Sequence, residues 1–76
     1  MEAKTIDIHT EYIKLDQFLK LADIVSSGGE AKLFIQDTPI MVNGEAENRR
    51  GKKLRNGDQI VVKGKSYLIR QESGSM

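Results

Sequence analysis

The chain has 76 residues and a net charge of +1, a length that allows one domain and no more. The absence of cysteine excludes a disulfide framework and a thiolate metal site. With a single histidine, a metal site would have to be built almost wholly from carboxylates, and we expect no metal and no other cofactor. Apolar runs are too short to span a membrane and the N-terminus lacks a secretory core, so we expect a cytoplasmic protein with no membrane partner.

The first segment alternates apolar and polar residues over Thr5-Ile6-Asp7-Ile8-His9, which predicts a strand with Ile6 and Ile8 facing inward. Tyr12-Ile13-Lys14 then leads into a first helix, for which Asp16 is the expected N-cap. Apolar residues recur at helical spacing through this segment and predict its buried face: Leu15, Phe18, Leu19, Ala22 and Val25.

A second helix is predicted by Ser27-Gly28-Gly29-Glu30, which fits a capping box. In that motif the Ser27 hydroxyl accepts the Glu30 N–H, and the Glu30 carboxylate reaches back to the Ser27 N–H. Ala31, Phe34 and Ile35 form the apolar stripe, and Pro39 prevents continuation beyond about Asp37. Few residues separate the helices, so they should form a tight helix-turn-helix hairpin.

The remaining segments are predicted to be β-strands joined by turns. Ile40-Met41-Val42 precedes Asn43-Gly44, the strongest short hairpin signal. Residues 45–53 have almost no apolar content and are expected to be irregular, with Leu54 returning to the core. Strands are expected over 59–63 and 66–70, after turns at Asn56-Gly57-Asp58 and Gly64-Lys65.

These elements predict one α+β domain over residues 1–70, followed by a polar tail over 71–76. The two short helices should pack on a small, mainly antiparallel sheet. We expect the domain to be a monomer.

Charge is distributed unevenly along the chain. Residues 1–38 have a net charge of −3 and residues 39–76 a net charge of +4. Arg49-Arg50-Gly51-Lys52-Lys53-Leu54-Arg55 contains five positive charges and no negative one. Such a concentrated cluster in a nearly neutral protein indicates a local anionic partner, although a solvated loop is the simpler alternative.

Four motifs in order resemble the S-four RNA-binding domain, also called the alpha-L motif. Ile13 to Lys20 is similar to its opening helix, usually Arg-Leu-Asp-x-x-Leu, with Lys14 where the family often has Arg. Ser27 to Lys32 resembles the start of its second helix. Val42-Asn43-Gly44 and Gly57-Asp58-Gln59-Ile60 resemble its hairpin and strand entry. The length, the two glycines and the Arg-Arg-Gly-x-Lys loop resemble the free-standing YaaA/YbcJ-type subgroup.

The resemblance implies binding of structured RNA, usually ribosomal RNA or tRNA, and a role in ribosome assembly, translation or RNA handling. A ribosomal subunit is a possible partner. Few aromatic residues are available to stack unpaired bases, so we expect recognition of phosphates and RNA shape. The candidate RNA-binding residues are Lys14, Lys20, Ser27, Gly28, Lys32, Arg49, Arg50, Lys52, Lys53 and Arg55.

Three alternatives stay open from the sequence. The Ser27-Gly28 turn caps a helix and could also bind a phosphate, but Glu30 in the same turn opposes an anion. The protein could instead be a protein–protein adaptor whose basic loop binds an acidic partner. An enzyme is disfavoured, because no serine has a nearby histidine base and we identify no catalytic residue.

Overall fold

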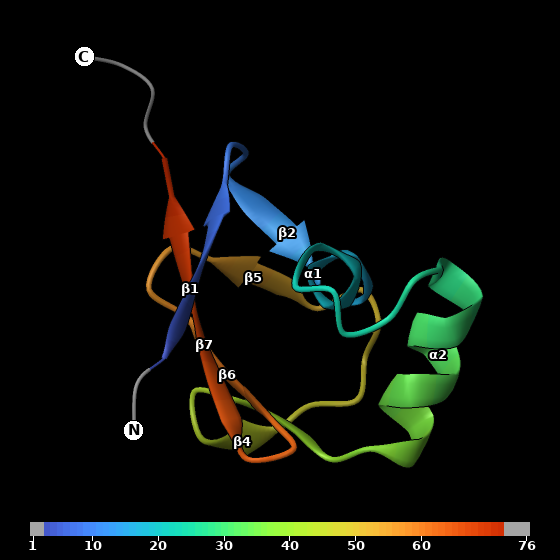
Figure 1. The fold of residues 1–76 in the computed structure, drawn as a ribbon. Coiled ribbons are helices and arrows are strands. Elements are labelled where there is room, and N and C mark those ends of the chain that lie inside the picture. The colour runs from blue at the N-terminus through green and yellow to red at the C-terminus, as the bar shows by residue number, and fades with distance from the viewer. Residues whose placement is uncertain (1–2, 73–76) are drawn as a thin grey trace.

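The computed structural model of the protein describes residues 3–72 and shows two helices beside a twisted sheet (Figure 1). A second, two-stranded sheet lies next to the first helix. The elements are β1 (Lys4–Ile8), β2 (Tyr12–Lys14), α1 (Leu15–Leu21), α2 (Gly28–Asp37), β3 (Ile40–Val42), β4 (Glu45–Ala46), β5 (Lys53–Arg55), β6 (Gln59–Val62) and β7 (Lys65–Gln71).

The larger sheet has the strand order β1-β7-β6-β3-β4, and the smaller sheet pairs β2 with β5. Every neighbouring pair is antiparallel except β1 and β7, which run parallel. The predicted α+β fold, with two helices on a mainly antiparallel sheet, is therefore confirmed.

Two tight hairpins set the register of the larger sheet. Asn43 and Gly44 connect β3 to β4 with φ values of 53° and 85°, and Lys63 and Gly64 connect β6 to β7 with φ values of 52° and 77°. Positive φ at both central residues defines the type I′ turn, whose twist matches that of paired strands. The second turn lies one residue earlier than predicted, because Lys65 already pairs with Val62.

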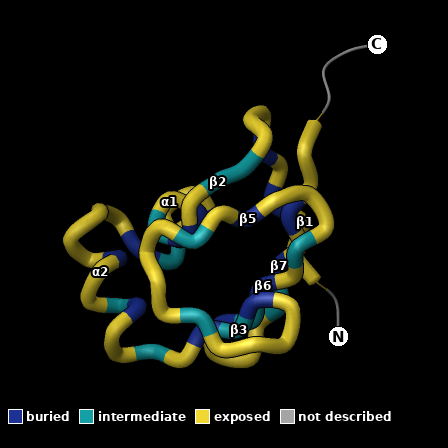
Figure 2. Tube along the Cα trace, turned by 180° about the vertical axis from the view of Figure 1, so that it is seen from behind, coloured by how far each residue is buried: buried dark blue, intermediate teal, exposed yellow. Residues whose placement is uncertain are grey.

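The core lies between the helices and the inner face of the sheet, where the buried positions of Figure 2 gather. Phe18 of α1 is fully buried and meets Tyr67 of β7 edge to face, with ring centroids 5.5 Å apart. The residues predicted to face inward are buried: Ile6, Ile8, Leu15, Phe18, Leu19, Ala22, Val25, Ala31, Ile35 and Leu54. Phe34 is only half-buried, so its predicted core position is partly correct.

Three local predictions differ from the structure. Asp16 does not cap α1: the N-cap is Lys14, and the Asp16 carboxylate accepts the N–H of Gln17 at 2.8 Å. The lead-in to the helix is itself a strand, β2, which pairs with β5. The segment expected to be irregular also contains β4 and the start of β5.

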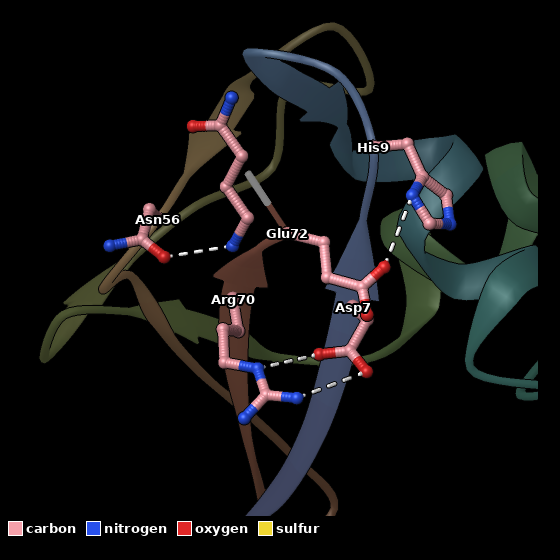
Figure 3. A network of polar contacts seen from close by, with 6 residues as sticks. Asp7, His9, Asn56, Arg70 and Glu72 are labelled. Carbon is pink, nitrogen blue, oxygen red and sulfur yellow. Dashed lines mark hydrogen bonds and ion pairs between the residues drawn. The ribbon is translucent and has the colours of Figure 1, made fainter. Parts of the chain in front are cut away.

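The open edge of the larger sheet is held by polar contacts between the chain ends (Figure 3). Arg70 Nε donates to Asp7 Oδ1 at 2.9 Å, and His9 Nδ1 lies 3.3 Å from Glu72 Oε1. The Gln71 N–H donates to Asn56 Oδ1 at 2.8 Å, so β7 continues one residue into the predicted polar tail. The rest of that tail, residues 73–76, lies outside the described residues.

Neither helix among residues 3–72 is long and apolar enough to cross a membrane. The same residues contain no group of three or more His, Asp or Glu side chains placed to hold a metal ion.

Candidate nucleic-acid interface

Positive side chains gather on one face of the small β2–β5 sheet. In its antiparallel register Lys14 lies opposite Lys53, Tyr12 opposite Arg55, and Ile13 opposite Leu54. Because side chains alternate along a strand, Tyr12, Lys14, Lys53 and Arg55 share one side of the sheet. Leu54 is fully buried and Ile13 packs against the core on the other side. We call these four residues on the outer side the basic face.

Tyr12 holds two of these cations close to its ring. Lys53 Nζ lies 4.9 Å and the Arg55 guanidinium carbon 5.6 Å from the ring centroid. Both distances fall within the range of cation–π attraction. The aromatic ring therefore restrains two long side chains that would otherwise sample many rotamers, and the basic face is partly preorganised.

The loop that contains Arg49, Arg50 and Lys52, here called the basic loop, is hydrogen-bonded through its backbone to the start of α1. The Leu15 N–H donates to Lys52 O at 2.9 Å, and the Asp16 N–H donates to Arg50 O at 3.2 Å. These bonds satisfy two N–H groups of the first helical turn, which have no partner within the helix. They explain how α1 begins at Leu15 although its N-cap residue, Lys14, provides no side-chain cap, and they place Arg50 and Lys52 beside the basic face.

Arg49 forms an ion pair with Glu47, an acid that lies outside the basic run of residues 49–55. Its Nε lies 2.9 Å and its Nη2 3.2 Å from the Glu47 carboxylate, which also accepts the Arg49 backbone N–H. The bonds from Arg49 hold the pKa of the Glu47 carboxyl below its ordinary value, so the carboxylate is charged at neutral pH. Of the five cations of the run, Arg49 is therefore partly compensated by an acid that lies outside it.

No such pairing is present for the basic face. Within residues 3–72 no carboxylate forms an ion pair with Lys14, Lys53 or Arg55. The nearby Asp58 carboxylate accepts the Arg55 backbone N–H at 2.8 Å and the Asn43 side-chain amide at 3.1 Å, so it serves the turn. The charges of the basic face stay directed at solvent.

The capping box at the start of α2 forms, but its return bond differs from the prediction. Ser27 Oγ accepts the Glu30 N–H at 3.2 Å, as predicted. The Glu30 carboxylate binds the N–H and hydroxyl of Ser26, each at 2.8 Å, in place of the Ser27 N–H. These bonds lower the pKa of Glu30, and its charge opposes an anion at Ser27 and Gly28. The structure therefore favours the capping role of this turn.

The two remaining candidates lie away from the basic face. Lys20 is in the last turn of α1, about 9 Å along the helix axis from Lys14 at 1.5 Å per residue. Lys32 is exposed on α2, a helix that packs mainly on α1. Lys14, Arg50, Lys52, Lys53 and Arg55 are thus the predicted residues that the fold brings together.

Tyr12 was missed as a functional candidate. The signal was present, since Tyr12-Ile13-Lys14 and Lys53-Leu54-Arg55 each place one apolar residue between two polar or cationic ones. That alternation is typical of a half-buried strand, but three residues are too few to distinguish it from a loop.

Comparison with known proteins gives the family of this fold. The family profile described as "S4 domain" matches residues 6–70, which span both sheets and both helices. The chain belongs to the S4 domain family. The resemblance inferred from the four motifs is thereby confirmed, and with it the RNA-binding class of this domain.

A relative of this S4 protein comes from Bacillus subtilis (strain 168). It is named "Probable ribosome maturation protein RlbA" and is 52% identical over 62 residues. The aligned region covers 82% of this chain and 87% of the relative. The two proteins are therefore similar over nearly their whole lengths.

Proposed function

We propose that this S4 protein binds structured RNA, ribosomal RNA or tRNA, through the basic face, and that it serves ribosome assembly as a non-enzymatic factor. The name of the Bacillus subtilis relative supports the place in ribosome maturation. Arg50 and Lys52, next to the basic face, extend the surface over which phosphates would be contacted.

The observation that supports this proposal best is the pairing of Lys14 with Lys53 across β2 and β5. Like charges directly opposite one another destabilise a sheet. Lys14 is also the N-cap of α1, where the helix dipole disfavours a positive charge. An arrangement that costs stability in the free protein becomes favourable when a polyanion lies across it.

The rigidity of this surface favours a folded RNA. The strands fix the Cα positions, the Tyr12 ring restrains two cations, and backbone bonds fasten the loop to α1. Phosphates already held at a matching spacing lose little conformational entropy on binding, whereas a flexible strand must first be ordered. Tyr12 is half-buried and already contacts two cations, so it offers little free stacking area.

The test is a binding competition at moderate salt, followed by fluorescence anisotropy. A labelled stem-loop bound to the protein is displaced by an unlabelled stem-loop or by an unpaired RNA of equal length. We expect the stem-loop to compete better, and the double variant Lys14→Gln/Arg55→Gln to lose affinity for both RNAs.

The control is Arg70→Gln, which removes one positive charge that is paired with Asp7 between β1 and β7 and does not belong to the basic face. It should bind the stem-loop as the unaltered protein does. Equal losses for control and double variant would contradict the assignment of the basic face. Binding to a cellular partner that survives nuclease treatment, with no affinity for RNA, would instead favour a protein adaptor.

A further inference from the structure

A hollow of about 520 Å³ lies between the end of α1 and the β6–β7 hairpin. Ala22–Ile24 form one wall, Val62–Tyr67 form the other, and Lys4 of β1 completes it. This volume lies within the range of sites that hold small molecules. None of the basic-face residues lines the hollow, so it is a separate feature of the molecule.

The hollow combines apolar surface with positive charge. Ala22, Val62 and Tyr67 are buried residues and contribute its apolar base. Lys4, Lys63 and Lys65 line it as exposed residues, and Asp23 is the acid among them, which leaves a net charge of +2. Among residues 3–72 none of these lysines forms an ion pair. Their charges are available to an anion.

Lys63 occupies an unfavourable backbone conformation at this site. The Asn43–Gly44 and Lys63–Gly64 turns have nearly the same φ values, but left-handed geometry suits Asn and Gly far better than Lys. Asp23, on the opposite wall, also has a positive φ of 63°. Non-glycine residues in this conformation cluster at functional sites.

The position of Lys63 is further restrained by Phe34 of α2. Lys63 Nζ lies 5.3 Å from the centroid of the half-buried Phe34 ring. This cation–π contact restrains the exposed Lys63 side chain beside α2, although Phe34 itself does not line the hollow. Lys63 therefore occupies a turn position whose backbone conformation favours asparagine, and its side chain contacts the Phe34 ring.

We propose that this hollow binds a phosphorylated nucleoside. The base would pack against Ile24, the half-buried apolar residue of the lining, over the floor formed by Ala22, Val62 and Tyr67, and the phosphate would contact Lys63 and Lys65. The Asp23 carboxylate offers an acceptor for a ribose hydroxyl or a base amino group. The ligand is either one unit of an unpaired RNA segment or a free nucleotide. This inference does not depend on RNA binding by the basic face.

The experiment is a titration of the ¹⁵N-labelled full-length chain, followed by amide chemical shifts. The probes are adenosine monophosphate, uridine monophosphate, adenosine, inorganic phosphate and an unpaired RNA tetranucleotide. We expect saturable shifts at Asp23, Ile24, Gly64 and Lys65 with either monophosphate, and much weaker ones with adenosine or phosphate alone. If the tetranucleotide binds more tightly than the monophosphates, the ligand is a unit of RNA. If it binds equally tightly, the ligand is a free nucleotide.

Two variants test the lysines. Lys63→Asn removes the charge and suits the left-handed turn, so a loss of binding cannot be attributed to misfolding. Lys65→Gln removes the neighbouring charge. Each should weaken monophosphate binding by about three- to tenfold, while the Arg70→Gln control leaves it unchanged.

Two results of the titration would overturn the proposal. One is the absence of saturable shifts at the hollow for every probe up to about 10 mM, a concentration that detects even millimolar affinity. The other is binding of adenosine or inorganic phosphate as tight as that of the monophosphates. Unchanged affinity in both lysine variants would likewise contradict it.

Discussion

Replacing Lys14 by Gln should stabilise the free protein while weakening its binding to RNA. The substitution relieves the repulsion across the strand pair from Lys53 and removes a cation from the N-cap of α1. Lys14 makes no cation–π contact with Tyr12, unlike Lys53 and Arg55, so little attraction is lost. The expected gain is about 0.5–1 kcal/mol in the free energy of unfolding. In a domain of this size that raises the melting temperature by about 2–8 °C.

Thermal unfolding followed by circular dichroism measures this gain, and repetition at about 1 M salt should reduce it, because the Debye length falls to about 3 Å. RNA affinity is measured over a salt series. If about four phosphates are neutralised, the log–log slope is about −3.6, and loss of Lys14 reduces its magnitude by about 0.9. A lower melting temperature for Lys14→Gln, or an unchanged salt slope, would refute the reasoning.

Three further predictions concern single side chains. Arg50→Ala should reduce RNA affinity and the salt slope more than Arg49→Ala, because Arg49 is already paired with Glu47; equal effects in anisotropy titrations would argue against this pairing. Ser27→Ala should lower the free energy of unfolding by about 1 kcal/mol through loss of the α2 cap, measured by urea denaturation; an unchanged midpoint would contradict the cap. The lowered pKa of Glu30 contributes stability above its ordinary value of 4.5, and that contribution is lost as pH falls through the folded-state pKa. As pH falls through this acid range, the denaturation midpoint of Glu30→Gln should therefore fall less steeply than that of the unaltered protein. The same pH dependence in both proteins would contradict the contacts of Glu30 with Ser26.

The core was predictable from the sequence because its apolar residues repeat at the spacing of a helix or a strand. Leu15, Leu19 and Ala22 repeat at helical spacing, and Ile6 and Ile8 at strand spacing, and all are buried as expected. The Asn43–Gly44 hairpin was predictable because few residue pairs adopt positive φ so readily.

The candidate site was less predictable because it depends on contacts between distant segments. β2 and β5 are three residues each and become strands only by pairing with one another, about forty residues apart in sequence. The first N–H groups of α1 donate to carbonyls of Arg50 and Lys52, so the sequence around Lys14 does not show how this helix start is stabilised. Glu47 lies outside the run of cations, and its pairing with Arg49 depends on the path of the loop.

Crosslinking in cells tests the central claim most directly. The protein, the Lys14→Gln/Arg55→Gln double variant and the Arg70→Gln control are each crosslinked to RNA by ultraviolet light, and the bound RNA is sequenced. We predict that crosslinks concentrate at defined sites in ribosomal RNA or tRNA, that the double variant loses them, and that the control retains them. Crosslinks no more frequent than background, or equally frequent in the double variant, would contradict RNA binding through the basic face.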